Sequence, residues 1–419
     1  MGLSKSVEAQ NTPSIDAQIA EVAGIDLARM SFREFESMAL RSDPVLAKLK
    51  AQVRGLKEKA IADDSLPDPR LKVGLMNLPV DNLVDFEQEP MTQKLIGISQ
   101  TFPPFGSLDH QRARTEALAT AMEAEAAARE LEVLRNVRNT WLELYFQFEA
   151  EKLIQISVRT FAELVDVARF RYRAGRGNQH DLVRAQMELA LLNDRLRNIE
   201  ITKFTILARM GRWIGIPRIN ASLPLKFPNL PNLPSYDEIR AAIGNHPAVQ
   251  AAVARVQAGR AGEKAAKSLY FPKVMLEFTY GQRDFDRADL VSGMLSLELP
   301  FFPGKRQSRL LASSRQETGA ARSAMDQQRR VLNEMLEAEF ARWNRLEERF
   351  KLYKNEVIPL SSQFAESSMN AYRTGVSDFA IQARARLAEL DNGIEALRVQ
   401  IERSKAHANL LYIYGERTL

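Results

Sequence analysis

Two stretches of the chain, 70–76 and 273–280, alternate apolar and polar residues with the two-residue period of β-strands. One side of each stretch is apolar: Leu71, Val73 and Leu75 in the first, and Val274, Leu276, Phe278 and Tyr280 in the second. After polar loops, further apolar runs follow at 92–102 and 290–299. We therefore predict two β-hairpins, 70–102 and 273–299, with strands of about ten residues, long enough to cross a bilayer when tilted.

Elsewhere the apolar residues recur in the three- and four-residue steps of helices that pack side by side. Between Ser107 and Tyr172 there is no proline or glycine to stop such a helix. A helix of ~65 residues is about 100 Å long, too long for a compact globular core, so we expect a coiled coil. Pro359 lies inside the matching run of the second half and should kink it.

The second half of the chain repeats the first about 200 residues later. The recurrence is clearest in one motif, where Tyr172, Arg173, Gly175 and Ala185 return as Tyr372, Arg373, Gly375 and Ala385. A glycine between two helical runs indicates the tip of a helical hairpin, because glycine readily adopts the left-handed conformation that ends a helix. We predict two such tips, near 172–181 and near 372–381.

The two halves also share their boundaries. Each opens with a capping box, in which a serine and a glutamate satisfy the first free N–H groups of a helix: Ser31 with Glu34, and Ser235 with Glu238. Each should end in a helix that stops near a glycine, Gly215 or Gly415. We predict an N-terminal extension (1–30), a first repeat (31–215), a linker with five prolines (216–234), a second repeat (235–415) and a C-terminal tail (416–419).

The composition excludes several functions. The chain has no cysteine, which rules out disulfides, thiolate metal sites and a cysteine nucleophile. Its formal charge of +5 is spread among charges of both signs along the helices, so we expect no nucleic-acid partner. No two of the four histidines have metal-ligand spacing, and there is no P-loop or catalytic triad. We expect no enzymatic activity, no cofactor and no metal site.

Four strands cannot close a barrel alone, because open sheet edges are unstable, especially in lipid. Strands from several chains would complete one barrel, from which the long helices extend as a tube. The order of helix, β-hairpin and long helical hairpin, present twice from about residue 31, resembles the TolC family of outer-membrane efflux ducts. The motifs that carry the resemblance are the tips YRAG…DLVRAQ and YRTG…IQARAR, the corners QTFPPFG and LELPFFPG, the Pro359–Tyr372 spacing, and ARMGRWIGIP at 208–217.

The resemblance implies an α+β fold made mainly of long α-helices, assembled as a homotrimeric duct. Three chains with four strands each would form a 12-stranded transmembrane β-barrel in the outer membrane of a Gram-negative bacterium, in contact with its lipid. Twelve helices would form an α-helical barrel in the periplasm. The duct would be passive, and it would open at its helical tips on docking to a periplasmic adaptor (membrane fusion) protein and an inner-membrane pump of the RND type.

The cargo is less narrowly defined than the fold. Residues 74–106 resemble the CzcC- and CusC-like heavy-metal branch of the family, which implies heavy-metal cations. Drugs or a type I secretion substrate are alternatives for the same duct, because selection takes place largely at the inner-membrane pump. A soluble coiled-coil scaffold is the alternative from another class, in which 70–102 and 273–299 would form a small solvated sheet.

The resemblance also assigns roles to residues at the two tips. Adaptor docking would involve Tyr172, Arg173, Gly175, His180, Tyr372, Arg373 and Gly375. In the family, acidic residues six and nine positions after the second tip glycine ring the pore, and this chain has Ile381 and Arg384 there instead. We expect a pore gate of Asp181, Ile381 and Arg384, with Ile381 as a hydrophobic constriction. Arg384 would form ion pairs with Asp181, Asp378 or Glu389.

Overall fold

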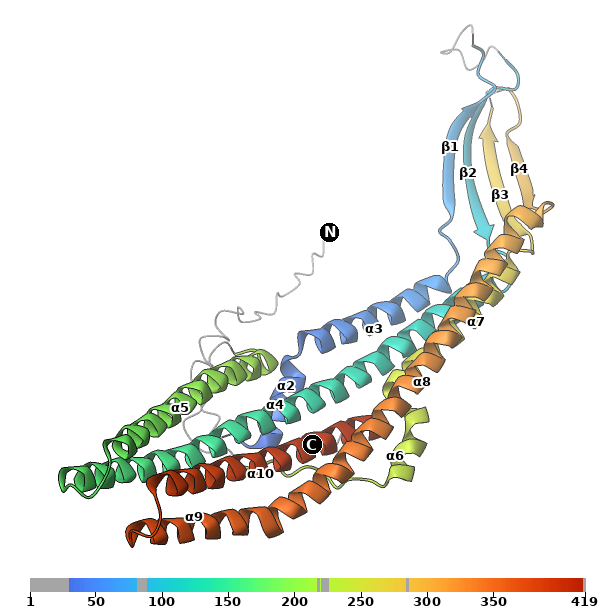
Figure 1. Cartoon of the computed structure of the whole chain (residues 1–419). Coiled ribbons are helices and arrows are strands. Elements are labelled where there is room, and N and C mark those ends of the chain that lie inside the picture. Colours follow the sequence, from blue (N-terminus) through green and yellow to red (C-terminus); the bar gives the residue numbers. More distant parts are fainter. Residues whose placement is uncertain (1–29, 81–88, 217–218, 220–225, 284–285, 417–419) are drawn as a thin grey trace. The chain divides into compact units, whose positions relative to one another are not determined.

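The computed structural model describes residues 30–80, 89–216, 219, 226–283 and 286–416 (Figure 1). The chain divides into two compact units. The tip unit comprises 1–46, 129–246 and 332–419, and the sheet unit comprises 47–128 and 247–331. Three predicted segments lie wholly or partly outside the described residues: the extension 1–30 except Met30, part of the linker 216–234, and residues 417–419 of the tail. The fold is mainly α-helical with one small antiparallel sheet, which confirms the predicted α+β class.

The sheet unit contains four antiparallel strands in the order β1-β2-β3-β4. They are β1 (Arg70–Met76), β2 (Gln93–Phe102), β3 (Lys273–Gln282) and β4 (Leu290–Glu298). Within the hairpins Val73 pairs with Ile96, and Leu276 pairs with Leu295. Ile98 of β2 pairs with Phe278 of β3, so the hairpins of the two halves join into one continuous sheet.

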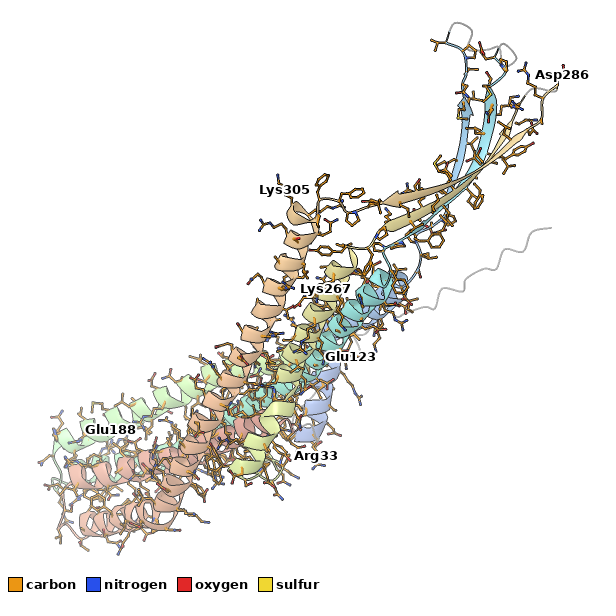
Figure 2. The ribbon with its side chains drawn as sticks, turned by 90° about the vertical axis from the view of Figure 1, so that its right-hand side faces the viewer. Arg33, Glu123, Glu188, Lys267, Asp286 and Lys305 are labelled. Carbon is orange, nitrogen blue, oxygen red and sulfur yellow. The ribbon has the colours of Figure 1, made fainter. Side chains whose placement is uncertain are left out.

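This register sorts the side chains of the sheet onto two different faces. One face is predominantly apolar, and its exposed apolar members include Leu71, Val73, Leu75, Ile96, Ile98, Phe278, Tyr280, Val291, Leu295 and Leu297. The opposite face carries mainly polar and small residues, among them Lys72, Gly97, Ser99, Glu277, Thr279, Ser292 and Ser296. Figure 2 shows the side chains projecting from the sheet. The predicted alternation therefore produces a two-faced sheet.

The helical part of the sheet unit holds α3 (Pro44–Asp63), α7 (Pro247–Ser268), the 3₁₀ turn η3 (Pro303–Lys305) and the first parts of α4 (Ser107–Arg173) and α8 (Gln307–Leu352). Polar contacts tie α3 to α4: Thr115 Oγ1 donates to Asp63 at 2.6 Å, and Lys57 lies 2.6 Å from Glu123. No helix in the described ranges is both long and apolar enough to cross a membrane.

The tip unit contains α2 (Phe32–Ser42), α5 (Gln179–Ile214), α6 (Tyr236–Ala242), η2 (Ile243–Asn245), α9 (Ile358–Arg373), α10 (Phe379–Tyr414) and the remaining parts of α4 and α8. Both predicted capping boxes are present at the starts of α2 and α6. The predicted stops of α5 and α10 are also confirmed, because Gly215 (φ 75°) and Gly415 (φ 86°) cap them in the left-handed conformation.

Pro359 interrupts the long helix of the second half. Proline lacks an N–H and its ring clashes with the carbonyl four residues earlier, so a regular α-helix cannot continue through it. Here α8 ends at Leu352, Tyr353–Val357 form a π-helical turn, and α9 begins at Ile358 with Pro359 in its first turn. The predicted disturbance therefore takes the form of a π-helical turn just before the proline.

Several apolar cores hold the described part of the tip unit together. Where α2 packs against α4 and α5, the core includes Phe35, Trp141 and Met210. Toward the helical tips, a second core combines residues of α4, α5, α9 and α10, including Phe161, Leu192, Tyr372, Phe379 and Leu390. The helical hairpins of both halves therefore share one core near their tips.

Candidate functional site

The first helical tip joins α4 to α5. The N–H of Gly175 donates to the Tyr172 carbonyl at 3.0 Å, and the N–H of Arg176 donates to the Arg171 carbonyl at 2.8 Å. These two bonds form a Schellman motif, which satisfies the last carbonyls of a helix and needs a residue in the left-handed conformation. Gly175 supplies it, with φ of 66°, and no atom lies within 4 Å of where a Cβ would be.

The second tip, between α9 and α10, repeats this geometry 200 residues later. The N–H of Gly375 (φ 78°) donates to the Tyr372 carbonyl at 3.2 Å, and the N–H of Val376 donates to the Ala371 carbonyl at 2.9 Å. The side chain of Val376 is exposed at this tip, in the position that Arg176 occupies at the first. The two tips therefore have the same backbone conformation but expose different side chains.

The two tip tyrosines have different surroundings. Tyr172 is 45% exposed, whereas Tyr372 is 5% exposed. The Tyr372 ring packs against Phe379 in an edge-to-face arrangement with a centroid distance of 6.0 Å, and the guanidinium carbon of Arg171 lies 4.8 Å from its centroid. Tyr372 therefore belongs to the shared core of the tips, whereas Tyr172 is on the surface. Arg173 and Gly175 are exposed at the first tip, and Arg373 and Gly375 are exposed at the second.

The expected gate residues lie near the starts of α5 and α10: Asp181 and Ile381 in the first turns, and Arg384 in the second turn of α10. Asp181 is partly buried, and its carboxylate lies 3.6 Å from Nδ1 of the exposed His180. Ile381 and Arg384 are exposed on α10. Within the described part of a single chain Arg384 has no ion pair, and Glu389 is bound by Arg386 at 2.8 Å instead. The ion pairs expected for Arg384 therefore stay a prediction for contacts between chains.

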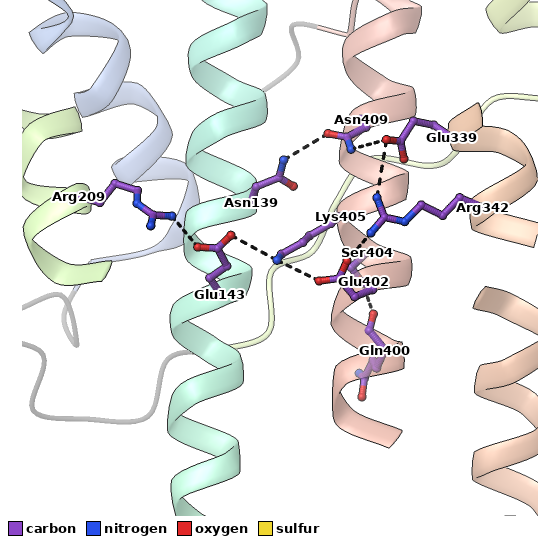
Figure 3. Close-up of polar contacts among 10 residues, drawn as sticks. All are labelled: Asn139, Glu143, Arg209, Glu339, Arg342, Gln400, Glu402, Ser404, Lys405 and Asn409. Atoms are coloured by element: carbon purple, nitrogen blue, oxygen red, sulfur yellow. Dashed lines mark hydrogen bonds and ion pairs between the residues drawn. The ribbon is translucent and has the colours of Figure 1, made fainter. Parts of the chain in front are cut away.

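Farther from the tips, a chain of polar contacts crosses four helices of the tip unit (Figure 3). Glu143 of α4 accepts from Arg209 of α5 at 2.7 Å and from Lys405 of α10 at 3.3 Å. Lys405 also contacts Glu402 at 3.1 Å, and Glu402 pairs with Arg342 of α8. Charges of opposite sign alternate along this path, so each side chain has an oppositely charged neighbour.

A second polar path also crosses α4, α10 and α8, and it meets the first at Arg342, which lies 3.9 Å from Glu339 (Figure 3). The Asn139 amide on α4 donates to Asn409 on α10 at 3.2 Å, and the Asn409 amide donates to Glu339 on α8 at 3.1 Å. Both paths connect helices of the first half with helices of the second. These residues could not be identified from the sequence, because nothing in the local pattern indicates which long side chains meet across helices.

A buried ion pair lines a cavity of about 360 Å³ in the tip unit. Glu36 and Arg138 are each 2% exposed, and Arg138 Nε donates to Glu36 at 2.6 Å. Burial raises the pKa of Glu36, and the positive charge of Arg138 opposes this rise. Removing either partner would leave a buried charge without compensation, which is strongly destabilising. We interpret the pair as a structural connection between α2 and α4.

Among the described residues, no group of three or more histidine and acidic side chains could hold a metal ion. On the polar face of the sheet, Lys72 of β1 pairs with Glu277 of β3 across β2. Gly97 of β2 lies between them, and a Cβ at Gly97 would come within 2.9 Å of the Phe278 carbonyl oxygen. The close approach of the strands therefore accounts for this glycine.

Comparison with known proteins identifies the relatives of this chain. A family model described as "Outer membrane efflux protein" matches residues 36–201 and 239–416, one segment in each half. No curated protein sequence gives a significant match.

Several solved structures have a similar fold. The MtrE outer membrane channel of Neisseria gonorrhoeae, in its open state, has a TM-score of 0.78 at 16% identity, covering 92% of this chain and 89% of that one. The outer membrane protein VceC of Vibrio cholerae has a TM-score of 0.77 at 16% identity, covering 92% and 96%. CusC has a TM-score of 0.76 at 14% identity, covering 92% of each chain.

Proposed function

The chain belongs to the outer membrane efflux protein family, and from this we propose that it is the outer-membrane exit duct of a tripartite efflux system. Proteins of this family are channels, so the chain is not an enzyme. The membership also argues against a soluble coiled-coil scaffold. The duct itself would be passive, lie in the outer membrane of a Gram-negative bacterium, and extend its helices into the periplasm.

The two-faced sheet is the observation that carries the proposal. Its exposed apolar face, with residues such as Val73, Phe278 and Val291, would be costly in water and is suited to lipid. Its polar face, with Lys72 and Glu277, is suited to a water-filled lumen. Because four strands leave two open edges, we propose that three chains combine their sheets into one 12-stranded barrel.

We further propose that the two helical tips bind a periplasmic adaptor protein, which links the duct to an inner-membrane pump of the RND type. The exposed surface around Tyr172, Arg173, Gly175 and His180, and around Arg373 and Gly375, supports this assignment. Tyr372 would contribute by shaping the second tip from inside, because its ring is buried.

Closure of the duct would depend on the first two turns of α5 and α10. The exposed apolar side chain of Ile381 is available to meet its copies in the other chains, and such a constriction would exclude water and ions. The exposed Arg384, which has no ion pair within the described part of its own chain, is available to pair across chains with Asp181, Asp378 or Glu389.

We propose heavy-metal cations as the cargo, on the resemblance of residues 74–106 to the heavy-metal branch. Deleting the gene in its host should then lower tolerance to metal salts and leave tolerance to lipophilic drugs unchanged. The reverse result would assign the duct to drugs, and a defect in the secretion of a protein would assign it to a type I system.

The duct itself is tested by conductance. Purified full-length protein added to a planar lipid bilayer should insert and give small, stable single-channel currents. These currents should increase in a variant that weakens the gate, such as Ile381→Ala. Absence of any channel activity from folded, detergent-purified protein would contradict the proposal, whatever the cargo.

A further inference from the structure

The corner between β4 and α8 combines exposed aromatic side chains with exposed cations. Phe301 and Phe302 are 75% and 90% exposed in this chain. After Pro303 and Gly304 come Lys305 and Arg306 around η3, and then Arg309 in the first turn of α8. Figure 2 shows Lys305 projecting from this corner. We call residues 299–309 the basic corner.

The basic corner continues the apolar face of the sheet. Leu295 and Leu297 belong to that face, because they pair with Leu276 and Val274 of β3. Leu299 is also exposed, and Phe301 follows two residues later. The two phenylalanines therefore lie where the apolar face ends and the helices begin. In a membrane-spanning sheet this is the level of the lipid headgroups, where aromatic rings are enriched.

Positive charge exceeds negative charge at this corner. Glu298 lies 3.6 Å from Arg306 and 3.9 Å from Lys273, so one carboxylate faces two cations. Lys305 and Arg309 are exposed and have no ion pair within the described part of the chain. Lys305, Arg306 and Arg309 against the one carboxylate of Glu298 leave an excess of two positive charges next to Phe301 and Phe302 in the chain.

The corresponding corner of the first half lacks these cations. Phe105 is 88% exposed there, and Gly106 (φ 72°) makes the turn into α4. The next residues up to Gln111 include no lysine or arginine. Arg112 follows, and its charge is satisfied by Asp64 at 3.0 Å and Glu116 at 2.8 Å. Turning from strand into helix therefore does not require a basic corner.

We propose that the basic corner binds the phosphate of an anionic phospholipid in the periplasmic leaflet of the outer membrane. This inference rests on the proposed function, because it places the apolar face of the sheet in lipid. Phe301 and Phe302 would insert among the acyl chains, and Lys305, Arg306 and Arg309 would attract the headgroup. Each basic residue near an anionic membrane surface contributes about a fivefold gain in binding, so three together would give a marked preference for anionic lipid.

The test compares lipids bound to the full-length trimer by native mass spectrometry. Mixed micelles would contain phosphatidylglycerol or phosphatidylcholine, which differ in headgroup charge. We expect wild type to retain phosphatidylglycerol preferentially. The triple variant Lys305→Gln, Arg306→Gln, Arg309→Gln should lose most of this preference, by roughly tenfold or more. A matched control removes the same charge from exposed positions farther along α8, with Arg315→Gln, Arg322→Gln, Arg330→Gln, and should keep it.

Three outcomes would overturn the proposal. Equal retention of both lipids by wild type is one, and equal loss of preference in the two triple variants is another. Tighter retention of lipopolysaccharide than of phosphatidylglycerol would also contradict it, because lipopolysaccharide phosphates offer similar chemistry from the opposite leaflet. Bilayer conductance of the same preparations separates this inference from the function: a conducting trimer without lipid preference overturns only the inference, whereas a protein that never inserts overturns both.

The aromatic residues provide an independent check. Phe301→Ser, Phe302→Ser should weaken retention of phosphatidylglycerol and phosphatidylcholine alike, because acyl chains are common to both lipids. Phe105→Ser, which removes an equally exposed ring from the corner without cations, should leave the preference for phosphatidylglycerol unchanged. Loss of that preference in Phe105→Ser would show that the binding site lies elsewhere.

Discussion

The guanidinium carbon of Arg171, in the last turn of α4, lies 4.8 Å from the ring centroid of Tyr372, in the last turn of α9. This contact joins the helical hairpins of the two halves at their tips. Tyr372 also packs against Phe379 and is buried in the core that both hairpins share. The tips of one chain are therefore parts of one packed structure, although they are 200 residues apart in sequence.

We predict that Arg171→Gln loosens this junction. A cation over an aromatic ring contributes about 0.5–1 kcal/mol at an exposed site, so the thermal midpoint should fall slightly and resting conductance should rise. Arg173→Gln removes the same charge two residues later, where the side chain is exposed at the end of the helix, and should change neither. Equal effects of the two substitutions would show that the contact with Tyr372 is unimportant.

The gate assignment predicts the effect of two substitutions on conductance in a planar bilayer. Ile381→Ala should raise the resting conductance, because it removes the apolar side chain expected at the constriction. Arg384→Ala should raise it by removing ion pairs between chains. Val376→Ala shortens another exposed apolar side chain at the same tip and should have no effect. If Ile381→Ala and Arg384→Ala both leave conductance and drug permeability unchanged, the gate lies elsewhere.

Gly375 is predicted to be required for its backbone conformation. Gly375→Ala meets no atom within 4 Å, but its φ of 78° is unfavourable for alanine, so we expect a loss of about 1–2 kcal/mol. Gly319 also has open space around it but lies inside α8, so Gly319→Ala should stabilise the protein by about 0.5–1 kcal/mol. Thermal unfolding of both variants measures whether the two changes in stability have opposite signs. Destabilisation by both substitutions would contradict the prediction.

Because His407 is largely buried, we expect the free energy of unfolding to depend on pH. Burial lowers the pKa of His407 to about 4, with contributions from the charges of Arg403 and Arg138, although the Pro231 carbonyl opposes the shift. The folded state therefore keeps this histidine neutral, while the unfolded state binds a proton below a pKa of about 6.5. Its contribution is fully present above pH 6.5 and is lost as the pH falls toward 4, by up to about 3 kcal/mol.

Unfolding of His407→Gln between pH 7 and pH 4 measures this effect. The variant should lose less stability than wild type over that range, and the difference should be concentrated below pH 6.5. His180→Gln, at an exposed position, serves as the control and should follow wild type. Parallel pH profiles for wild type and His407→Gln would contradict the prediction.

Features governed by local rules could be predicted from the sequence. The capping boxes at Ser31 and Ser235 and the helix ends at Gly215 and Gly415 depend on residues only a few positions apart, and all are present. The strands could also be predicted, because apolar and polar residues alternate along them with a period of only two residues. A proline has a similarly local effect, although the form of the disturbance before Pro359 did not follow from the proline alone.

Features that depend on tertiary packing could not be predicted in this way. Tyr172 and Tyr372 occupy equivalent positions in a repeated motif, yet one is exposed and the other buried, because only Tyr372 faces the other hairpin. The pairing of β2 with β3 joins residues about 180 positions apart. The contacts of Glu143 with Arg209 and Lys405 likewise depend on how three helices pack, since many other long charged side chains have the same local pattern.

Assembly of this chain as a membrane-spanning trimer can be measured from the mass of the purified full-length protein. Light scattering, with detergent and after its removal, would be combined with circular dichroism to establish that the protein is folded. We expect a folded particle of three chains that stays dispersed only in detergent. A folded monomer or dimer that remains dispersed without detergent would contradict it.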